Sequence, residues 1–222
     1  MKLLSTNTAR IGFITCASTF VLGYLNGHTQ ATINNFVSPQ TGNLVHLGLN
    51  LANRDSALVL TGFLMFFAFV IGSAAAQNIL KREMTPTRQF MLGWTIFAVP
   101  IPIYLFFHEH FSANMIIFTL SAVSGVAMSF FRRIGEVELN NCIVTGNMRF
   151  FGINFHEAFF GGDKKRIRPM WIFFLAIFLF FFGAYVCGLA LRVGEGMAAW
   201  VLISTALVPY IVGAGLADGS TG

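Results

Sequence analysis

Two short segments of identical sequence are the residues best suited to chemistry in this chain. They are Thr41-Gly42-Asn43 in the first half and Thr145-Gly146-Asn147 in the second. Threonine is a good residue to start a helix, and glycine lets another group approach the backbone closely. A helix N-terminus presents free N–H groups and a partial positive charge, which suit an anion or a polar solute. We therefore expect these six residues to bind a small solute.

Further neutral polar side chains precede the first of these segments. Five amides fall within fifteen residues, namely Asn26, Gln30, Asn34, Asn35 and Gln40. That is more than helix packing needs, so Asn26, Gln40 and the nearby His28 are expected to line the outer approach to the site. For His28, a structural hydrogen bond is as good an interpretation as a proton carrier.

A packing role is the alternative for the Thr-Gly-Asn segments. Small residues and asparagine in membrane helices often serve close packing and interhelical hydrogen bonds without touching a solute. Both interpretations remain open at the level of the sequence. Catalysis finds no support, because the chain contains no HExxH, GxSxG, CxxC or glycine-rich phosphate loop. We expect no enzyme activity, no cofactor and no metal site.

The composition places these segments in a lipid bilayer. Of the 222 residues, 55% are hydrophobic and only 10% are charged, and the mean hydropathy is +0.70. A soluble domain carries about 25% charged residues, because its surface must face water. The charged side chains of this chain could not coat a soluble globule. The composition therefore excludes a soluble enzyme and a nucleic-acid-binding module, and it makes membrane lipid the expected surroundings.

Uncharged runs give the expected transmembrane helices, each of which needs about 20 apolar residues. One run covers residues 11–53, and five shorter runs cover 56–80, 89–107, 111–131, 169–191 and 196–217. The first run is too long for one helix, and Pro39 interrupts it. We expect six spans, with a short re-entrant helix over residues 42–51. The segment 139–155 should enter in the same way from the opposite face.

The basic residues predict the orientation. Twelve of the fourteen fall on one side of this six-span arrangement, and only Arg54 and Arg192 fall on the other. Positively charged loops face the cytoplasm. Both termini are therefore expected to be cytoplasmic, in a multi-pass protein of the cell (inner/plasma) membrane.

The two halves of the chain resemble each other. TGNLVHLGLN at residues 41–50 matches TGNMRFFGIN at 145–154 at five of ten positions, and residues 63–72 match 174–183 in the helices that follow. The chain is therefore expected to form a single membrane domain, residues 1–222, made of repeats at 11–107 and 111–217. Three spans per repeat would invert the second copy relative to the first. Inverted repeats with broken helices are typical of secondary transporters.

The motifs also resemble those of a known family, the YoaK-like six-span bacterial inner-membrane proteins, a domain family of unknown function. The resemblance covers roughly residues 12–215 and is carried by three stretches: GYLNG at 23–27, TGN with Gly48 downstream, and FRRIG at 131–135 leading into VTGN. The family pattern usually has Asp at the position of Asn26, and a Gln-Asn type pair near Ala127 and Met128. The resemblance implies fold and location, but no substrate.

The sequence as a whole predicts an all-α integral membrane protein. It is expected to act as a small secondary transporter or facilitator, with a small polar or anionic solute bound near the membrane midplane between the two Thr-Gly-Asn helix ends. The alternatives are a non-transporting scaffold that binds a partner protein, and a passive channel. Six short spans are also compatible with a homodimer.

Overall fold

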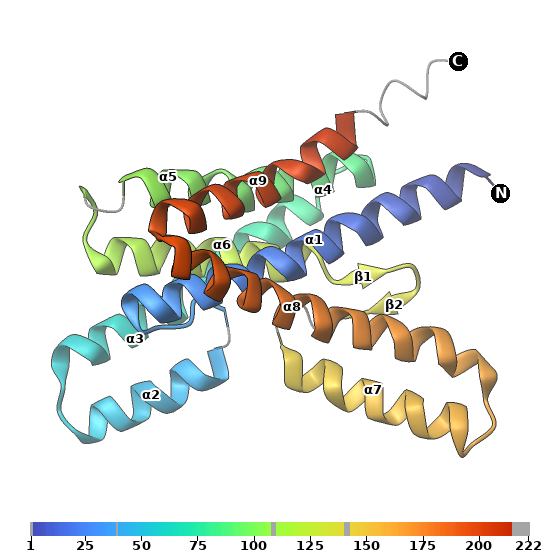
Figure 1. Ribbon diagram of the computed structural model, residues 1–222, viewed down its shortest axis with the longest axis horizontal. Coiled ribbons are helices and arrows are strands. Elements are labelled where there is room, and N and C mark those ends of the chain that lie inside the picture. Colours follow the sequence, from blue (N-terminus) through green and yellow to red (C-terminus); the bar gives the residue numbers. More distant parts are fainter. Residues whose placement is uncertain (1, 39, 108–109, 140–142, 215–222) are drawn as a thin grey trace.

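The computed structural model describes residues 2–38, 40–107, 110–139 and 143–214, and these are almost entirely helical (Figure 1). The first half contains α1 (Lys2–Ile33), α2 (Gln40–Ala52), α3 (Ser56–Leu80), α4 (Pro86–Ala98) and α5 (Pro100–Phe107). The second half contains α6 (Ala113–Phe130), α7 (Val144–Phe159), the 3-10 turn η2 (Lys164–Arg166), α8 (Ile167–Val193) and α9 (Glu195–Ala214). Two strands of two residues each, β1 (Arg133–Ile134) and β2 (Val137–Glu138), form a small hairpin. The all-α expectation is confirmed.

Two helix pairs form the centre of the molecule: α1 packs along α8, and α3 packs along α6. The short helices α2 and α7 pack on α3 and α8 respectively. In Figure 1, α2 and α7 both begin near the middle of the molecule and run outward in opposite directions. Helices α4, α5 and α9 lie together on the side of α1 that faces away from α2 and α7. The beginning of α1 and the end of α9 lie at the same end of the molecule.

Glycines allow both central pairs to approach closely. A methyl group added at Gly23 of α1 would overlap the backbone of Phe180 in α8, and one at Gly183 of α8 would overlap the backbone of Phe20 in α1. The pair α3–α6 is built in the same way, because Gly72 would meet the carbonyl of Ala122. Small residues let membrane helices approach closely and gain dispersion contacts. Gly72 and Gly183 are aligned with each other when the two halves are compared.

Three of the described helices are long and apolar enough to cross a membrane, at Ser56–Leu80, Ala113–Phe130 and Lys164–Val193. The expected span over 89–107 is different, because it is divided into α4 and α5. Pro100 begins α5 and lacks the N–H that would continue the ladder of α4, which accounts for the division. Helix α2 has 13 residues and is therefore about 20 Å long, too short to cross a hydrocarbon core of about 30 Å.

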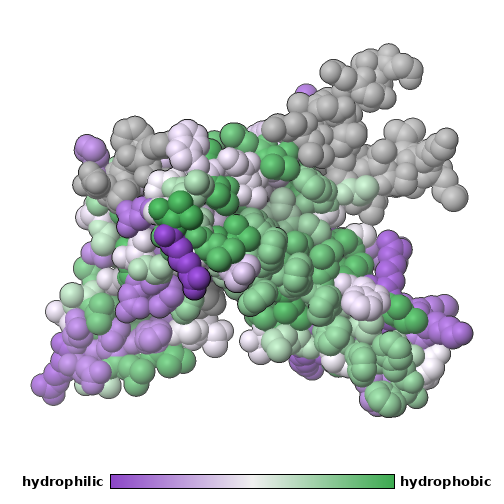
Figure 2. All heavy atoms as spheres, viewed as in Figure 1, coloured by the Kyte–Doolittle hydropathy of each residue, from purple (hydrophilic) through white to green (hydrophobic). Residues whose placement is uncertain are grey.

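The outer surface of the helices is strongly apolar. Large exposed side chains include Val45 on α2, Phe67 on α3, Phe159 on α7 and Phe181 on α8. Figure 2 shows hydrophobic residues over much of the visible face, with hydrophilic residues mostly toward the two ends of the long axis. Monomeric soluble proteins rarely expose apolar patches of this extent. The arrangement is that of a protein whose helices face lipid.

Candidate functional site

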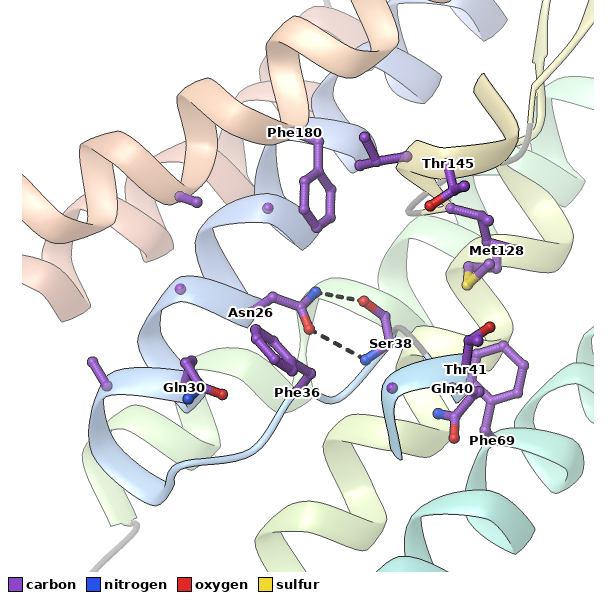
Figure 3. Close-up of a pocket in the computed structure, with 17 residues that line it drawn as sticks. Asn26, Gln30, Phe36, Ser38, Gln40, Thr41, Phe69, Met128, Thr145 and Phe180 are labelled. Atoms are coloured by element: carbon purple, nitrogen blue, oxygen red, sulfur yellow. Dashed lines mark hydrogen bonds between the residues drawn. The ribbon is translucent and has the colours of Figure 1, made fainter. Parts of the chain in front are cut away.

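A cavity of about 730 Å³ lies where the two short helices begin (Figure 3). The N-terminus of α2 contributes Gln40, Thr41 and Gly42, and the N-terminus of α7 contributes Val144 and Thr145. The remaining wall comes from α1, α3, α6 and α8 and from the coil before α2. The cavity therefore draws on both halves of the chain, and the two Thr-Gly-Asn segments approach it from opposite directions.

The break before α2 explains how the first helix end reaches the cavity. Helix α1 ends at Ile33, and Asn34 takes a left-handed conformation with φ of 51°, which asparagine tolerates better than most residues. The chain then turns back along α1. Pro39 follows and α2 begins at Gln40, in agreement with the expected break of the first long segment.

Asn26 of α1 holds this returning coil in place. Its Nδ2 donates to the carbonyl of Leu22 at 2.7 Å and to the Ser38 hydroxyl. Its Oδ1 accepts from the backbone N–H groups of Val37 at 3.1 Å and Ser38 at 3.3 Å. Asn26 is only 3% exposed, and Figure 3 shows its amide pointing at Ser38. A buried backbone segment outside a helix needs such partners, and one side chain supplies several of them.

Five of the nine residues expected at the solute site line this cavity: Asn26, Gln40, Thr41, Gly42 and Thr145. The other four do not. Asn43 is buried, and its Nδ2 donates to the carbonyl of Phe36 at 2.9 Å. Gly146 lies within the first turn of α7. Asn147 is buried, and its backbone N–H donates to the carbonyl of Ile143 at 3.2 Å.

His28 lies apart from the cavity, between α1 and α5. Its ring is buried and meets the edge of Tyr104, with ring centroids 5.8 Å apart. The Tyr104 hydroxyl lies 3.4 Å from His28 Nδ1. The structural interpretation of this histidine fits these contacts better than a place on the solute approach.

The chemistry of the cavity is neutral. Among the residues that line it, none carries a charged side chain; the polar ones are Asn26, Gln30, Ser38, Gln40, Thr41 and Thr145. Oε1 of Gln40 is buried and accepts no hydrogen bond from the part of the chain that the structure describes. An unpaired buried carbonyl costs about 1–3 kcal/mol. A bound molecule or water with an N–H or O–H group would satisfy it.

Several lining residues were not expected. Phe36, Phe69, Met128 and Phe180 give the cavity an apolar half. The sequence contained a signal for one wall, because Gly23, Gly27 and Ala31 recur at every fourth position of α1 and lie on one helix face. The aromatic residues gave no such signal, since 26 phenylalanines occur throughout the chain.

An all-α architecture with lipid-facing helices, enclosing an uncharged cavity between two helix ends, defines the class as an integral membrane protein. The chain belongs to the family described as "Protein of unknown function (DUF1275)", whose model matches residues 14–213. This assignment is consistent with the resemblance to YoaK-like proteins. The curated proteins and the solved structures compared with the sequence contain no match.

Proposed function

We propose that this protein is a small secondary transporter or facilitator of the bacterial inner membrane, built as a YoaK-like six-span protein with both termini in the cytoplasm. The apolar outer faces of its helices support contact with membrane lipid. The orientation is supported by the twelve basic residues that the six-span arrangement assigns to one side. Binding of a small polar or anionic solute near the midplane is the proposed activity.

The proposal includes two inverted repeats. The pairing of α1 with α8 and of α3 with α6 supports this, because each pair joins the first long helix of one half to the helix after the short helix of the other. The glycine contacts at Gly72 and Gly183 support it as well, since aligned residues of the two halves make equivalent close approaches. Binding sites of inverted-repeat transporters lie at the interface between repeats.

The observation that carries the function is the cavity between the N-termini of α2 and α7. Non-helical backbone at membrane depth is tolerated where it is buried in protein or lines a watery cavity. Here Val37 and Ser38 of the coil before α2 are buried, and Phe36 and Ser38 line the cavity. Thr41 and Thr145 approach the cavity from opposite sides and offer hydroxyl groups to a solute, together with the free N–H groups of their helix ends.

A scaffold without transport is the second candidate, and one observation favours it. Asn43 uses its side chain to bind the backbone of its own half, as a residue that locks helices together would do. The two candidates differ in what the cavity holds. A scaffold keeps its stability whatever solute is present, whereas a transporter is stabilised by its solute, by about 2.7 kcal/mol at a hundredfold excess over Kd.

The test is a thermal-shift screen of the purified protein in detergent against small polar and anionic metabolites. We expect at least one solute to raise the unfolding temperature of the wild type, and the Thr41→Val/Thr145→Val double variant to lose that response. Thr95→Val is the matched control, because the Thr95 hydroxyl bonds within its own helix to the carbonyl of Met91. An equal response in the wild type and a well-folded double variant would remove these threonines from the site.

A further inference from the structure

A second cavity, of about 290 Å³, lies beside the first at the outer end of α1 and α2. Its polar lining consists of five amides and one imidazole: Gln30, Asn34, Asn35, Asn43, His46 and Asn50. We call this cavity the amide vestibule. Three of the five amides that precede the first Thr-Gly-Asn segment line it, namely Gln30, Asn34 and Asn35. Asn43, which does not line the central cavity, lines the vestibule.

The two cavities have a common wall. Gln30 and Phe36 line both of them. The Nε2 group of Gln30 donates to Oδ1 of Asn34 at 2.9 Å, which ties this part of the wall to the left-handed end of α1. Figure 3 shows Gln30 and Phe36 toward one end of the central cavity and Thr145 and Met128 toward the other. Gln30 and Phe36 therefore lie at the boundary between the two cavities.

The side chains that line the two cavities favour one class of solute. Amide groups offer both donors and acceptors without charge. Neither cavity is lined by a carboxylate, lysine or arginine among the residues that the structure describes. An ion that enters such surroundings loses hydration without gaining a charged partner, and that cost is large. An uncharged molecule with both donors and acceptors can exchange its hydrogen bonds to water for hydrogen bonds to the amides.

We propose that the amide vestibule is a second binding site, the outer mouth of the solute pathway, and that it takes uncharged solutes with several hydrogen-bonding groups. Phe36 separates this site from the central cavity. The inference rests on the proposed function and narrows its polar or anionic solute to an uncharged one. Gln40, with its unpaired buried carbonyl, is the acceptor that such a solute meets in the central cavity.

The experiment uses thiol reagents as the solutes. Cys16, Cys142 and Cys187 are replaced by alanine, and one reporter cysteine is introduced by Asn50→Cys in the vestibule or by Thr145→Cys in the central cavity. Three methanethiosulfonates of similar size serve as probes: the neutral hydroxyethyl, the anionic sulfonatoethyl and the cationic trimethylammonium-ethyl reagent. Each labelling rate is divided by the rate for the same variant unfolded in SDS.

All three reagents should label the vestibule cysteine of the Asn50→Cys variant. For each reagent, the labelling rate at position 145 is divided by the rate at position 50. This ratio should be at least about tenfold higher for the neutral reagent than for either charged one, because the charged groups lose hydration without compensation. Equal ratios for the three reagents would overturn the selection for uncharged solutes.

The role of Phe36 is tested in the same background. Phe36→Ala should speed neutral labelling at position 145, and Phe36→Trp should slow it. Phe69→Ala is the matched control, because Phe69 lines the central cavity but not the vestibule. If Phe69→Ala accelerates labelling as much as Phe36→Ala, or if the tryptophan has no effect, the proposed route is wrong. If a Phe36 variant does not give a monodisperse gel-filtration peak, Phe36→Leu is used in its place.

The result is separable from that of the thermal-shift screen. Labelling measures access to the two cavities and does not depend on finding the solute. A charge-selective route past Phe36 without any stabilising solute would support the pathway and count against the solute site at Thr41 and Thr145. A stabilising solute without that route would do the reverse.

Discussion

The two connections that lead into the short helices provide hydrogen-bond partners for their backbone groups in different ways. Between α1 and α2, residues 34–38 form a coil held by the side chain of Asn26. Between α6 and α7, the chain forms the hairpin β1–β2, which turns at Gly135 with φ of 63°. Backbone groups of the second connection bond to one another, as when the N–H of Leu139 donates to the carbonyl of Arg132 at 2.7 Å.

The difference follows from the surroundings of each connection. The first lies beside the cavity, and there a single buried amide takes the place of a hydrogen-bonded ladder. The second packs against α1 and α8 and carries Arg132 and Glu138. Their 3.4 Å ion pair is exposed and therefore contributes little to stability. The first connection should be sensitive to one side chain, and the second should tolerate substitution.

The largest expected effect lies in a feature that the halves have in common, the glycine contacts. Gly72→Val and Gly183→Val should each lower the free energy of unfolding by about 3 kcal/mol or more, because the added side chain meets a backbone carbonyl that cannot move aside. If the two halves are equivalent, the two losses should be similar. SDS titration of the purified protein measures both.

Gly48→Ala and Gly152→Ala are the controls, since nothing lies within 4 Å of the added methyl group at either position. Alanine is favoured over glycine inside a helix by about 0.5–1 kcal/mol. These variants should be as stable as the wild type or slightly more stable. A large loss for Gly72→Val with no loss for Gly183→Val would show that the equivalence of the two halves does not extend to their packing.

A smaller effect is expected at Asn26, the residue that distinguishes the connections. Asn26→Leu should lower the free energy of unfolding by about 2–4 kcal/mol, because it leaves the N–H groups of Val37 and Ser38 unpaired in a buried place. Asn26→Asp retains oxygen acceptors for these groups, and in the neutral acid form that this buried, uncharged place favours it can still donate one hydrogen bond. It should be the less damaging substitution. Thermal unfolding in detergent compares the two variants.

The sequence indicated the region in which the cavity lies, because two independent signals coincided there. Pro39 predicted a break in the first long segment, and the duplicated Thr-Gly-Asn segments predicted the start of two helices. The sequence did not predict which side chains face the cavity. In the first turn of α2, Thr41 lines the cavity while Asn43 binds the carbonyl of Phe36, and that choice depends on where the returning coil lies. The aromatic wall and the contact of His28 with Tyr104 likewise join segments far apart in sequence.

The smallest effect is expected at the second connection, where Thr15 of α1 ties the hairpin to the helix bundle. The Thr15 hydroxyl donates to the carbonyl of Arg133 at 2.9 Å. Thr15→Val should lower the free energy of unfolding by about 0.5–1.5 kcal/mol, the usual net value of one hydrogen bond. It should also speed amide hydrogen exchange in β1 and β2, while the Thr95→Val control does not. Because the hairpin keeps its own ladder, α7 should remain in place, and labelling of the Thr145→Cys reporter should be unchanged. A loss as large as that of Asn26→Leu would mean that the second connection, like the first, depends on a single buried side chain.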